Sequence, residues 1–154
     1  MAKLIGVLSD THGLLRTEVA EKLSGCDLIL HAGDIGSHSV LVELERISEV
    51  IAVRGNVDRI DWARGLKESE CLEVEGKKIY LIHDLGRLAL RGLPRAVDIV
   101  VFGHSHRPSM ETKGGILYLN PGSAGPQRFN IPISMVLLKI RDSLVIPEFI
   151  EIQT

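Results

Sequence analysis

Hydrophobic residues in this chain fall mostly in short β-branched runs bounded by turn residues, a pattern typical of buried strands. In the first third of the chain the pattern predicts strands over residues 3–9, 27–31 and 50–53. The spacing of polar and apolar residues between these strands predicts two helices, over 18–23 and over 39–47. Thr17 is the expected N-cap of the first helix, and Gly25 is expected to end it. Alternating strands and helices indicate a mainly parallel sheet with right-handed crossovers.

The remainder of the chain is richer in strands. Tight-turn residues predict two hairpins, 70–74 with 77–82 around Glu75-Gly76, and 108–112 with 116–119 around Lys113-Gly114-Gly115. A helical stretch is predicted over 85–93, ending at Pro94, followed by a strand over 98–102 and a final antiparallel pair, 133–140 with 144–150. These elements predict an α/β protein whose two sheets pack face to face with helices outside.

Length and composition narrow the class of protein. The 154 residues show no linker or repeat, so we expect one domain spanning 1–154. Aromatic residues make up only 4%, which predicts an aliphatic core, and a net charge of −2 gives no strong nucleic-acid signal. Cys26 and Cys71 match no zinc or redox spacing and are expected to be buried free thiols. Without a visible signal peptide or membrane span, the expected location is cytoplasmic.

The strongest chemical signal is the polar segment that follows each of five predicted strands. These segments are Ser9-Asp10-Thr11-His12-Gly13, His31-Ala32-Gly33-Asp34, Arg54-Gly55-Asn56-Val57-Asp58, His83-Asp84 and Gly103-His104-Ser105-His106. Ligands of open α/β sheets gather outside the carboxyl ends of the strands. Five strands therefore bring Asp, His and Asn to one rim, where the glycines allow sharp turns and close approach of the backbone.

Each segment alone has an ordinary structural interpretation. Asp10 could open a turn, Asn56-Val57-Asp58 could form an Asx-turn, and His104 and His106 could share one strand face. The set favours a site, because all of these polar positions fall at strand ends.

The residue types favour a metal centre. Mixed carboxylate, imidazole and amide ligands suit borderline ions such as Mn²⁺, Fe²⁺, Co²⁺, Ni²⁺ or Zn²⁺, and the absence of thiolates argues against structural zinc. Two dications against two aspartates leave about +2 of local charge, which suits a phosphate group. Two ions ~3.5–4 Å apart can deprotonate a bridging water and clamp the phosphate.

These five motifs, in this order, resemble the calcineurin-like metallophosphoesterase superfamily. The short chain and the Ser-Asp-Thr-His-Gly opening resemble its small single-domain phosphodiesterase branch in bacteria and archaea, and the match extends to Asn120-Pro121-Gly122-Ser123. The resemblance implies a four-layer α/β/β/α sandwich, with two mixed β-sheets flanked by helices.

The resemblance also implies a ligand set for two divalent metal ions. The first ion would be held by Asp10, His12, Asp34 and His106, and the second by Asp34 as a bridge with Asn56, His83 and His104. Manganese is the expected metal, with nickel, cobalt, iron or zinc as alternatives. Asp34, Asn56 and His83 are the expected catalytic residues.

Two positions depart from the family pattern. Larger relatives have a histidine after the Gly-Asn pair, where it assists the leaving group, but this chain has Val57. We therefore expect a preference for diesters or activated esters. Asp84-Leu85 follows His83 where the family more often has Gly-His, which leaves the shape and charge of the adjoining substrate pocket open.

Other polar side chains have weaker expectations. His31 is expected to hydrogen-bond behind the ligands or in the core, and His38 to be solvated. Arg87, Arg91 and Arg95 repeat at helical spacing, which favours a solvated face over a phosphate site. The 120–123 segment is equally compatible with a plain turn and with a role in the pocket.

The leading hypothesis is a phosphodiesterase that cleaves a small phosphate ester with a bridging hydroxide and no covalent intermediate. One alternative is a non-catalytic protein-binding scaffold, as in the retromer subunit of this fold, and another is a phosphomonoesterase or nuclease. A serine hydrolase is disfavoured, because Gly122-Ser123-Ala124-Gly125 lacks the Gly-x-Ser-x-Gly elbow. Exposed sheet edges make a homodimer possible.

Overall fold

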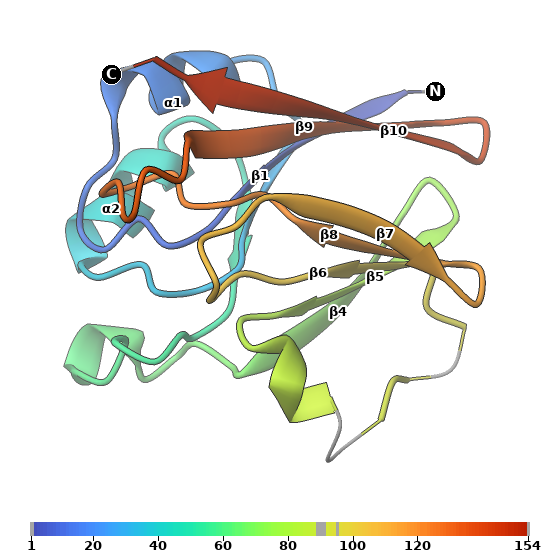
Figure 1. The fold of residues 1–154 in the computed structure, drawn as a ribbon, viewed down its shortest axis with the longest axis horizontal. Helices are drawn as coiled ribbons and strands as arrows, with labels where there is room; N and C mark the ends of the chain where they lie inside the picture. Colours follow the sequence, from blue (N-terminus) through green and yellow to red (C-terminus); the bar gives the residue numbers. More distant parts are fainter. Residues whose placement is uncertain (1, 89–91, 95, 154) are drawn as a thin grey trace.

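Two mixed five-stranded sheets form the body of the protein in this computed structural model, which describes residues 2–88, 92–94 and 96–153 (Figure 1). The first sheet contains, in spatial order, β10 (Leu144–Ile152), β9 (Ile133–Arg141), β1 (Lys3–Leu8), β2 (Leu28–His31) and β3 (Val50–Ala52). The second contains β4 (Ser69–Val74), β5 (Lys77–Ile82), β6 (Ile99–Val101), β8 (Ile116–Asn120) and β7 (Ser109–Lys113). In each sheet three strands are parallel, β1-β2-β3 and β5-β6-β8, and the others are antiparallel.

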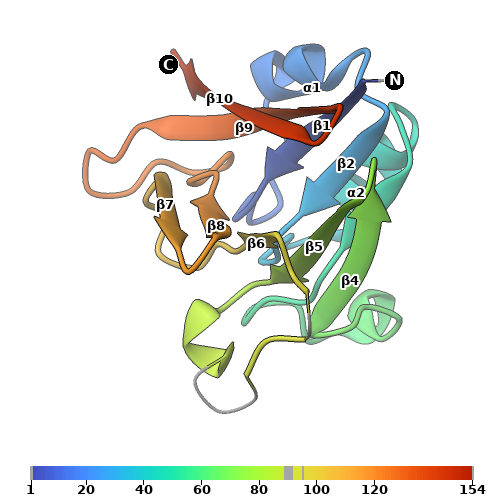
Figure 2. The same ribbon diagram turned by 90° about the vertical axis from the view of Figure 1, so that its right-hand side faces the viewer.

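The two α-helices lie outside the first sheet, and a short 3₁₀ helix lies outside the second (Figure 2). The helices α1 (Thr17–Leu23) and α2 (His38–Glu45) pack on the first sheet, and the short 3₁₀ helix η1 (Asp61–Ala63) lies in the connection after β3. The outer face of the second sheet is contacted by the 3₁₀ helix η2 (Leu85–Arg87) through Leu85. The predicted sandwich of two mixed sheets flanked by helices is confirmed.

The core follows from the two-residue periodicity of the strands. Ile5 and Val7 of β1 face the second sheet, where they join Ile79 and Leu81 of β5 in an aliphatic layer between the sheets. Leu8 faces the opposite way and packs among the helices of the first sheet. Full burial of an aliphatic side chain contributes about 1.5–3 kcal/mol, so this layer accounts for much of the stability without aromatic residues.

Most of the predicted elements are confirmed with small shifts of their bounds, and three predictions need correction. Thr17 is not the N-cap of α1; it is the first helical residue, and the N-cap is Arg16, whose side chain makes no capping hydrogen bond. The stretch predicted as one helix over 85–93 begins as the 3₁₀ helix η2, and residues 89–91 lie outside the described part of the chain.

The third correction concerns the thiols. Cys26 is buried as predicted, but Cys71 is exposed. Cys71 lies in β4, an edge strand whose Leu72 and Val74 pack against the layer between the sheets, and the alternation of the strand turns Cys71 to solvent.

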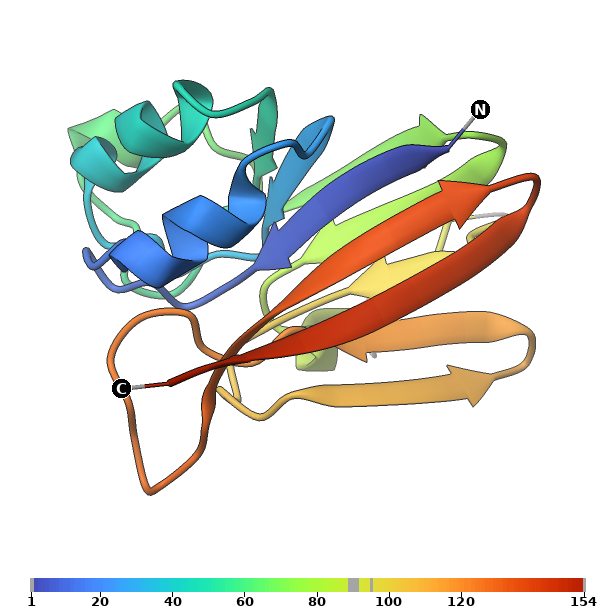
Figure 3. The same cartoon turned by 90° about the horizontal axis from the view of Figure 1, so that it is seen from above.

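The carboxyl ends of the parallel strands of both sheets meet at one rim. The connection after β1 bonds to the one after β2, because the Asp10 N–H donates to the Gly33 carbonyl at 3.0 Å. The connection after β6 bonds to the one after β5, because the Gly103 N–H donates to the His83 carbonyl at 3.0 Å. The turn between β9 and β10 lies at the opposite end of the first sheet (Figure 3). In the described ranges, no helix is long and apolar enough to span a membrane.

Candidate metal centre

The structure brings five of the seven predicted ligands into one buried cluster at this rim. Their donor atoms form two overlapping groups, each within 4.8 Å: Asp10, His12 and His106; and Asp10, Asp34 and His83. They come from the connections after β1, β2, β5 and β6. The prediction that separate strands deliver their polar residues to one place is therefore confirmed for these five.

The distances between the donor atoms suit ligands that share an ion. His83 Nε2 lies 3.2 Å from Asp34 Oδ2, and His12 Nε2 lies 3.6 Å from the same oxygen. Asp10 Oδ1 lies 3.5 Å from His106 Nε2 and 3.9 Å from the Nε2 atoms of both His12 and His83. Two donors bound to one ion at ~2.1 Å are roughly 3.0–3.4 Å apart, so only small adjustments are needed.

The hydrogen bond behind His83 decides which atom faces the cluster. His83 Nδ1 lies 2.7 Å from the Ala32 carbonyl, which can only accept, so Nδ1 carries the proton. In the neutral ring, Nε2 then directs a lone pair at the carboxylates of Asp34 and Asp10. That arrangement is repulsive unless a proton or a metal cation lies between them. A backbone-anchored histidine of this kind is typical of metal ligands.

Buried polar atoms without partners support the same interpretation. In the part of the chain that the structure describes, these atoms are Asp10 Oδ1, His12 Nε2, His83 Nε2, His106 Nδ1 and, outside the cluster, Trp62 Nε1. A buried polar atom without a partner costs about 1–3 kcal/mol. Three of these atoms, Asp10 Oδ1, His12 Nε2 and His83 Nε2, face one another and fit a site for divalent cations, which would satisfy oxygen and nitrogen donors together.

Each aspartate of the cluster has one anchored oxygen and one that faces the histidines. Asp34 Oδ1 accepts the Val57 N–H at 3.0 Å, while Oδ2 faces His12 and His83. Asp10 Oδ2 accepts the Ser9 hydroxyl at 2.7 Å and the His104 N–H at 3.2 Å, while Oδ1 faces three histidines. Both carboxylates therefore present a fixed oxygen between the two ligand groups.

The electrostatics of the cluster favour added positive charge. Burial alone would raise the pKa of Asp34, but His83, the Val57 N–H and His12 together hold it below its usual range. Burial alone would lower the pKa of His83, but the neighbouring Asp34 and Asp10 carboxylates raise it. Burial raises the pKa of Asp10 and lowers that of His106.

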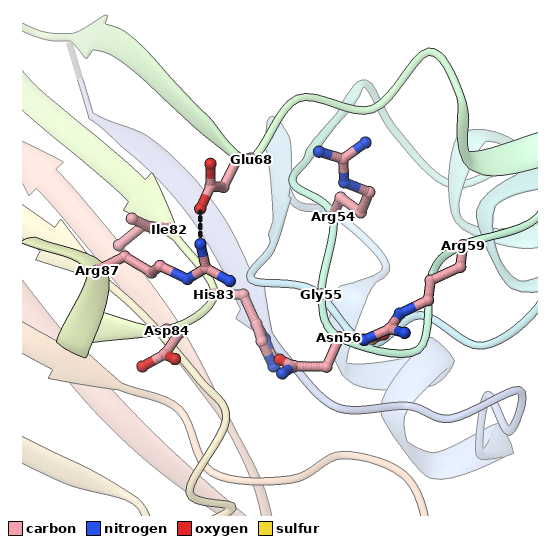
Figure 4. Close-up of a pocket in the computed structure, with 9 residues that line it drawn as sticks. All are labelled: Arg54, Gly55, Asn56, Arg59, Glu68, Ile82, His83, Asp84 and Arg87. Atoms are coloured by element: carbon pink, nitrogen blue, oxygen red, sulfur yellow. Dashed lines mark hydrogen bonds and ion pairs between the residues drawn. The ribbon is translucent and has the colours of Figure 1, made fainter.

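Asn56 and His104 lie beside the cluster rather than within it. Both are exposed. The Asn56 side chain extends from the loop after β3 toward His83, and Asn56 and His83 line one pocket (Figure 4). The ring centroids of His104 and His83 are 5.2 Å apart, with the rings edge to face. The last two predicted ligands are therefore placed next to His83, on the solvent side.

The backbone at the cluster adopts an uncommon conformation. Asp10, His12, Asp34, His104 and His106 all have positive φ angles, between 47° and 76°. Such angles are rare for residues other than glycine, and they cluster at functional sites, where surrounding contacts hold them in place. The short loops that direct these side chains to one point therefore carry local strain.

Two glycines permit the close approach of the loops, as predicted. A Cβ at Gly55 would collide with the backbone nitrogen and Oδ1 of Asp34. A Cβ at Gly103 would collide with the Ser9 hydroxyl and lie 2.8 Å from Asp10 Oδ2. Any side chain at either position would displace a carboxylate of the cluster.

Asp58 is a supporting residue that the sequence did not identify. Its buried carboxylate accepts three backbone N–H groups, from Ile35 at 3.1 Å, Gly36 at 3.0 Å and Gly55 at 2.9 Å. It therefore ties the loop that carries Asp34 to the loop that carries Asn56. The sequence signal that could have identified Asp58 is its place two positions after Asn56. That signal is weak, because an Asx-turn is the ordinary interpretation of the segment.

The 120–123 segment supports the cluster from behind. It is therefore neither a plain turn nor part of the pocket lining, the two interpretations that the sequence left open. The Asn120 amide donates to the Gly103 carbonyl and to the Ser105 hydroxyl, both at 3.2 Å. The Ser123 hydroxyl donates to the Asp10 carbonyl at 3.1 Å. Both side chains are buried, so they position the connections after β6 and β1.

The two remaining histidines behave as expected. His31 is fully buried, and its Nδ1 accepts the Gly33 N–H at 3.1 Å, so Nε2–H donates to the Thr11 hydroxyl at 3.0 Å. Burial lowers the pKa of His31 to about 3, and the ring is neutral. His38 is exposed at the start of α2, where its ring lies 6.3 Å from that of Trp62.

Arg87 has an exposed side chain, as the sequence predicts. It also lines a pocket of about 420 Å³ together with His83, Asn56, Arg54 and Arg59 (Figure 4). The 3₁₀ helix η2 comes directly after His83 and Asp84, which places Arg87 beside His83. Arg91 and Arg95 lie outside the described residues.

Comparison with known proteins agrees with this geometry. Residues 4–143 match the family model of the calcineurin-like phosphoesterase superfamily domain. The chain is 36% identical to a probable metallophosphoesterase of Methanocaldococcus jannaschii, covering 92% of this chain and 78% of the relative. It is 31% identical to phosphodiesterase YfcE of Escherichia coli K12, covering 84% of each.

Solved structures show the same fold. A predicted phosphoesterase from Streptococcus pneumoniae superposes with a TM-score of 0.78 and 28% identity, covering 98% of this chain and 90% of the other. Wild-type Vps29 of Entamoeba histolytica, in complex with Zn²⁺, superposes with a TM-score of 0.76 and 26% sequence identity. The match covers 96% of this chain and 98% of the other. The family match spans most of the chain and includes the whole ligand cluster. The chain therefore belongs to the calcineurin-like phosphoesterase superfamily, whose members depend on divalent metals.

Proposed function

We propose that this protein is a metal-dependent phosphodiesterase acting on a small phosphate ester. The observation that carries the proposal is the His83 ring, whose anchored Nδ1–H directs the Nε2 lone pair at two carboxylates. A cluster built this way has little stability advantage without bound cations. Relatives named phosphodiesterase, including YfcE, support the reaction class.

The proposed ligand set keeps the seven predicted residues. Asp10, His12, Asp34 and His106 hold the first ion, and Asp34 with Asn56, His83 and His104 holds the second. Asp34 is the bridge in this assignment, since its Oδ2 faces both His12 and His83. Manganese is the proposed metal, with nickel, cobalt, iron or zinc as alternatives.

The metal ions and the protein side chains would have different roles in the reaction. Two divalent ions would supply Lewis acidity and a water activated near neutral pH. Asp34 and His83 hold the geometry, and the side-chain carbonyl of Asn56 would add a ligand without negative charge from the exposed side of the cluster. Val57 occupies the position where larger relatives carry an acid, and it is 48% exposed and apolar. Leaving groups that need protonation should therefore react slowly.

The test is hydrolysis of bis(4-nitrophenyl) phosphate and of 4-nitrophenyl phosphate by metal-stripped protein, with each divalent metal added back in turn. We expect metal-restored cleavage that is faster for the diester and lost in Asp34→Asn. Asp142→Asn, an exposed aspartate in the β9–β10 turn, is the matched control and should keep full activity. Faster turnover of the monoester would refute the diester preference.

A second candidate, a protein-binding scaffold, is favoured by the likeness to Vps29. The two candidates differ in what they require of the cluster. A scaffold needs no catalytic metal, so folded protein that hydrolyses neither ester with any metal would support the scaffold and contradict the enzyme.

A further inference from the structure

The pocket beside His83 contains charged groups that the metal centre does not need. Arg54, Arg59 and Arg87 line it, against the two carboxylates of Glu68 and Asp84. None of the three arginines belongs to the proposed ligand set. Because the pocket shares His83 and Asn56 with the metal centre, a ligand held by these arginines would be next to the bound ions.

Arg87 is placed by a capped turn that directly follows His83. Asp84 Oδ1 accepts the Gly86 N–H at 3.0 Å and so caps η2, which carries Arg87. At this position the chain has Asp84-Leu85, where the family more often has Gly-His. Arg87 Nη1 lies 3.4 Å from Glu68 Oε1, a half-exposed pair that orients the guanidinium more than it stabilises the fold.

Arg59 is oriented from the other side of the pocket. Its Nε donates to the Asn56 carbonyl at 2.7 Å. Across the described residues, neither of its Nη groups has a partner, and neither does the side chain of Arg54. Figure 4 shows Arg87 and Arg59 approaching the His83–Asn56 pair from different elements. Two held guanidinium groups therefore keep free N–H donors beside the metal centre.

The charge and size of the pocket indicate what it holds. Three arginines outnumber two carboxylates, and each carboxylate already has one oxygen engaged, by the Gly86 N–H or by Arg87. The planar guanidinium forms paired hydrogen bonds with phosphate oxygens. At about 420 Å³ the pocket falls in the range of small-ligand sites and exceeds what the scissile phosphate alone requires.

We propose that Arg87 and Arg59, with Arg54 at the rim, bind a second phosphate group of the substrate. The substrate class is then a phosphodiester that carries an additional terminal phosphate beyond the scissile bond. This inference rests on the proposed function, because the scissile group is assigned to the metal centre. It deepens that function by assigning specificity to residues outside the ligand set.

The kinetic test uses a matched pair of substrates, thymidine 5′-(4-nitrophenyl phosphate) with and without a 3′-phosphate. We expect the 3′-phosphate to lower KM by about 10-fold, and Arg87→Gln or Arg59→Gln to remove most of that advantage. The measured quantity is the ratio of the KM values of the two substrates within each variant, so a general loss of activity in a variant does not count as a loss of the advantage. Arg141→Gln, an equal charge loss in the β9–β10 turn, is the control and should keep the advantage.

A binding test separates this inference from the proposed function. Calorimetry on the purified protein compares thymidine 3′,5′-bisphosphate with thymidine 5′-monophosphate. We expect the bisphosphate to bind about 10-fold tighter in the wild type and in Arg141→Gln, but not in Arg87→Gln. Equal affinities, in protein that hydrolyses the diester, would overturn the second-phosphate site and leave the phosphodiesterase intact. Absent hydrolysis with every metal would instead refute the proposed function.

Discussion

Backbone groups fix the atoms that face the candidate metal centre. The Ala32 carbonyl sets the tautomer of His83, and the Val57 N–H fixes one oxygen of Asp34. His31 lies behind these ligands, and it is held in a similar way, with both ring nitrogens bonded and the ring neutral. Its charge state should therefore affect folding more than catalysis.

The buried neutral His31 predicts a specific pH dependence. Burial lowers its pKa in the folded state to about 3, so between that value and the unfolded value of 6.5 only the unfolded chain binds the proton. Stability from this group is complete above pH 6.5 and is lost as the pH falls, with a slope of up to about 1.4 kcal/mol per pH unit. Urea unfolding from pH 7 to 4.5 should show a shallower decline for His31→Gln than for the wild type. Parallel curves would contradict this account.

Asp58 should prove as important as a ligand although it contacts no metal. Asp58→Asn replaces an oxygen that accepts N–H groups with an amide donor, so the loops that carry Asp34 and Asn56 lose their link. We expect a loss of about 2–4 kcal/mol in unfolding free energy and a large loss of diesterase activity. Asp61→Asn removes an exposed carboxylate that pairs with exposed Arg64, and it should change stability by less than about 0.5 kcal/mol. Equal effects in the two variants would rule out the link.

The strands and their connections bring these side chains together. Each proposed ligand follows a parallel strand. The loops after β6 and β1, from different sheets, touch because Gly103 lacks a side chain, and the loops after β3 and β2 of the first sheet touch because Gly55 lacks one. A methyl group at Gly55 would push against the Asp34 backbone and carboxylate, whereas Gly65 has open space around its Cβ position.

Gly55→Ala should therefore lower metal-restored diesterase activity by at least about 10-fold and reduce the melting temperature. Gly65→Ala should do neither. Activity assays and thermal melts of the two variants, measured side by side, provide the check. Full activity in Gly55→Ala would show that the loop contact is not required.

The sequence predicted the elements and the clustering of the candidate ligands better than it predicted the residues that support the cluster. Strand alternation and tight turns are local signals, and they placed nearly all the strands and both internal hairpins. Asp58 was missed as a supporting residue because its role depends on partners that only the fold brings close, at Ile35, Gly36 and Gly55. Cys71 was misplaced for a related reason, since an apolar run does not reveal which face of an edge strand meets solvent.

Over the whole molecule, metal binding should be linked to folding. The ligands come from both sheets, so an ion bound to Asp10, Asp34 and His83 cross-links the first sheet to the second. A metal ion present at a free concentration 100 times its dissociation constant stabilises the folded state by about 2.7 kcal/mol. Added Mn²⁺ should raise the melting temperature of the wild type and not that of Asp34→Asn.

The homodimer remains a prediction. The sheet edges at which two copies could pair are β10, β3, β4 and β7.

The proposed two-metal site is formed by Asp10, His12, Asp34, Asn56, His83, His104 and His106. Anomalous diffraction from crystals grown with Mn²⁺ would locate the ions themselves. We expect two peaks, ~3.5–4 Å apart, one beside His12 and His106 and one beside His83, with Asp34 between them. A single peak, no peak, or peaks away from these residues would contradict the two-metal site.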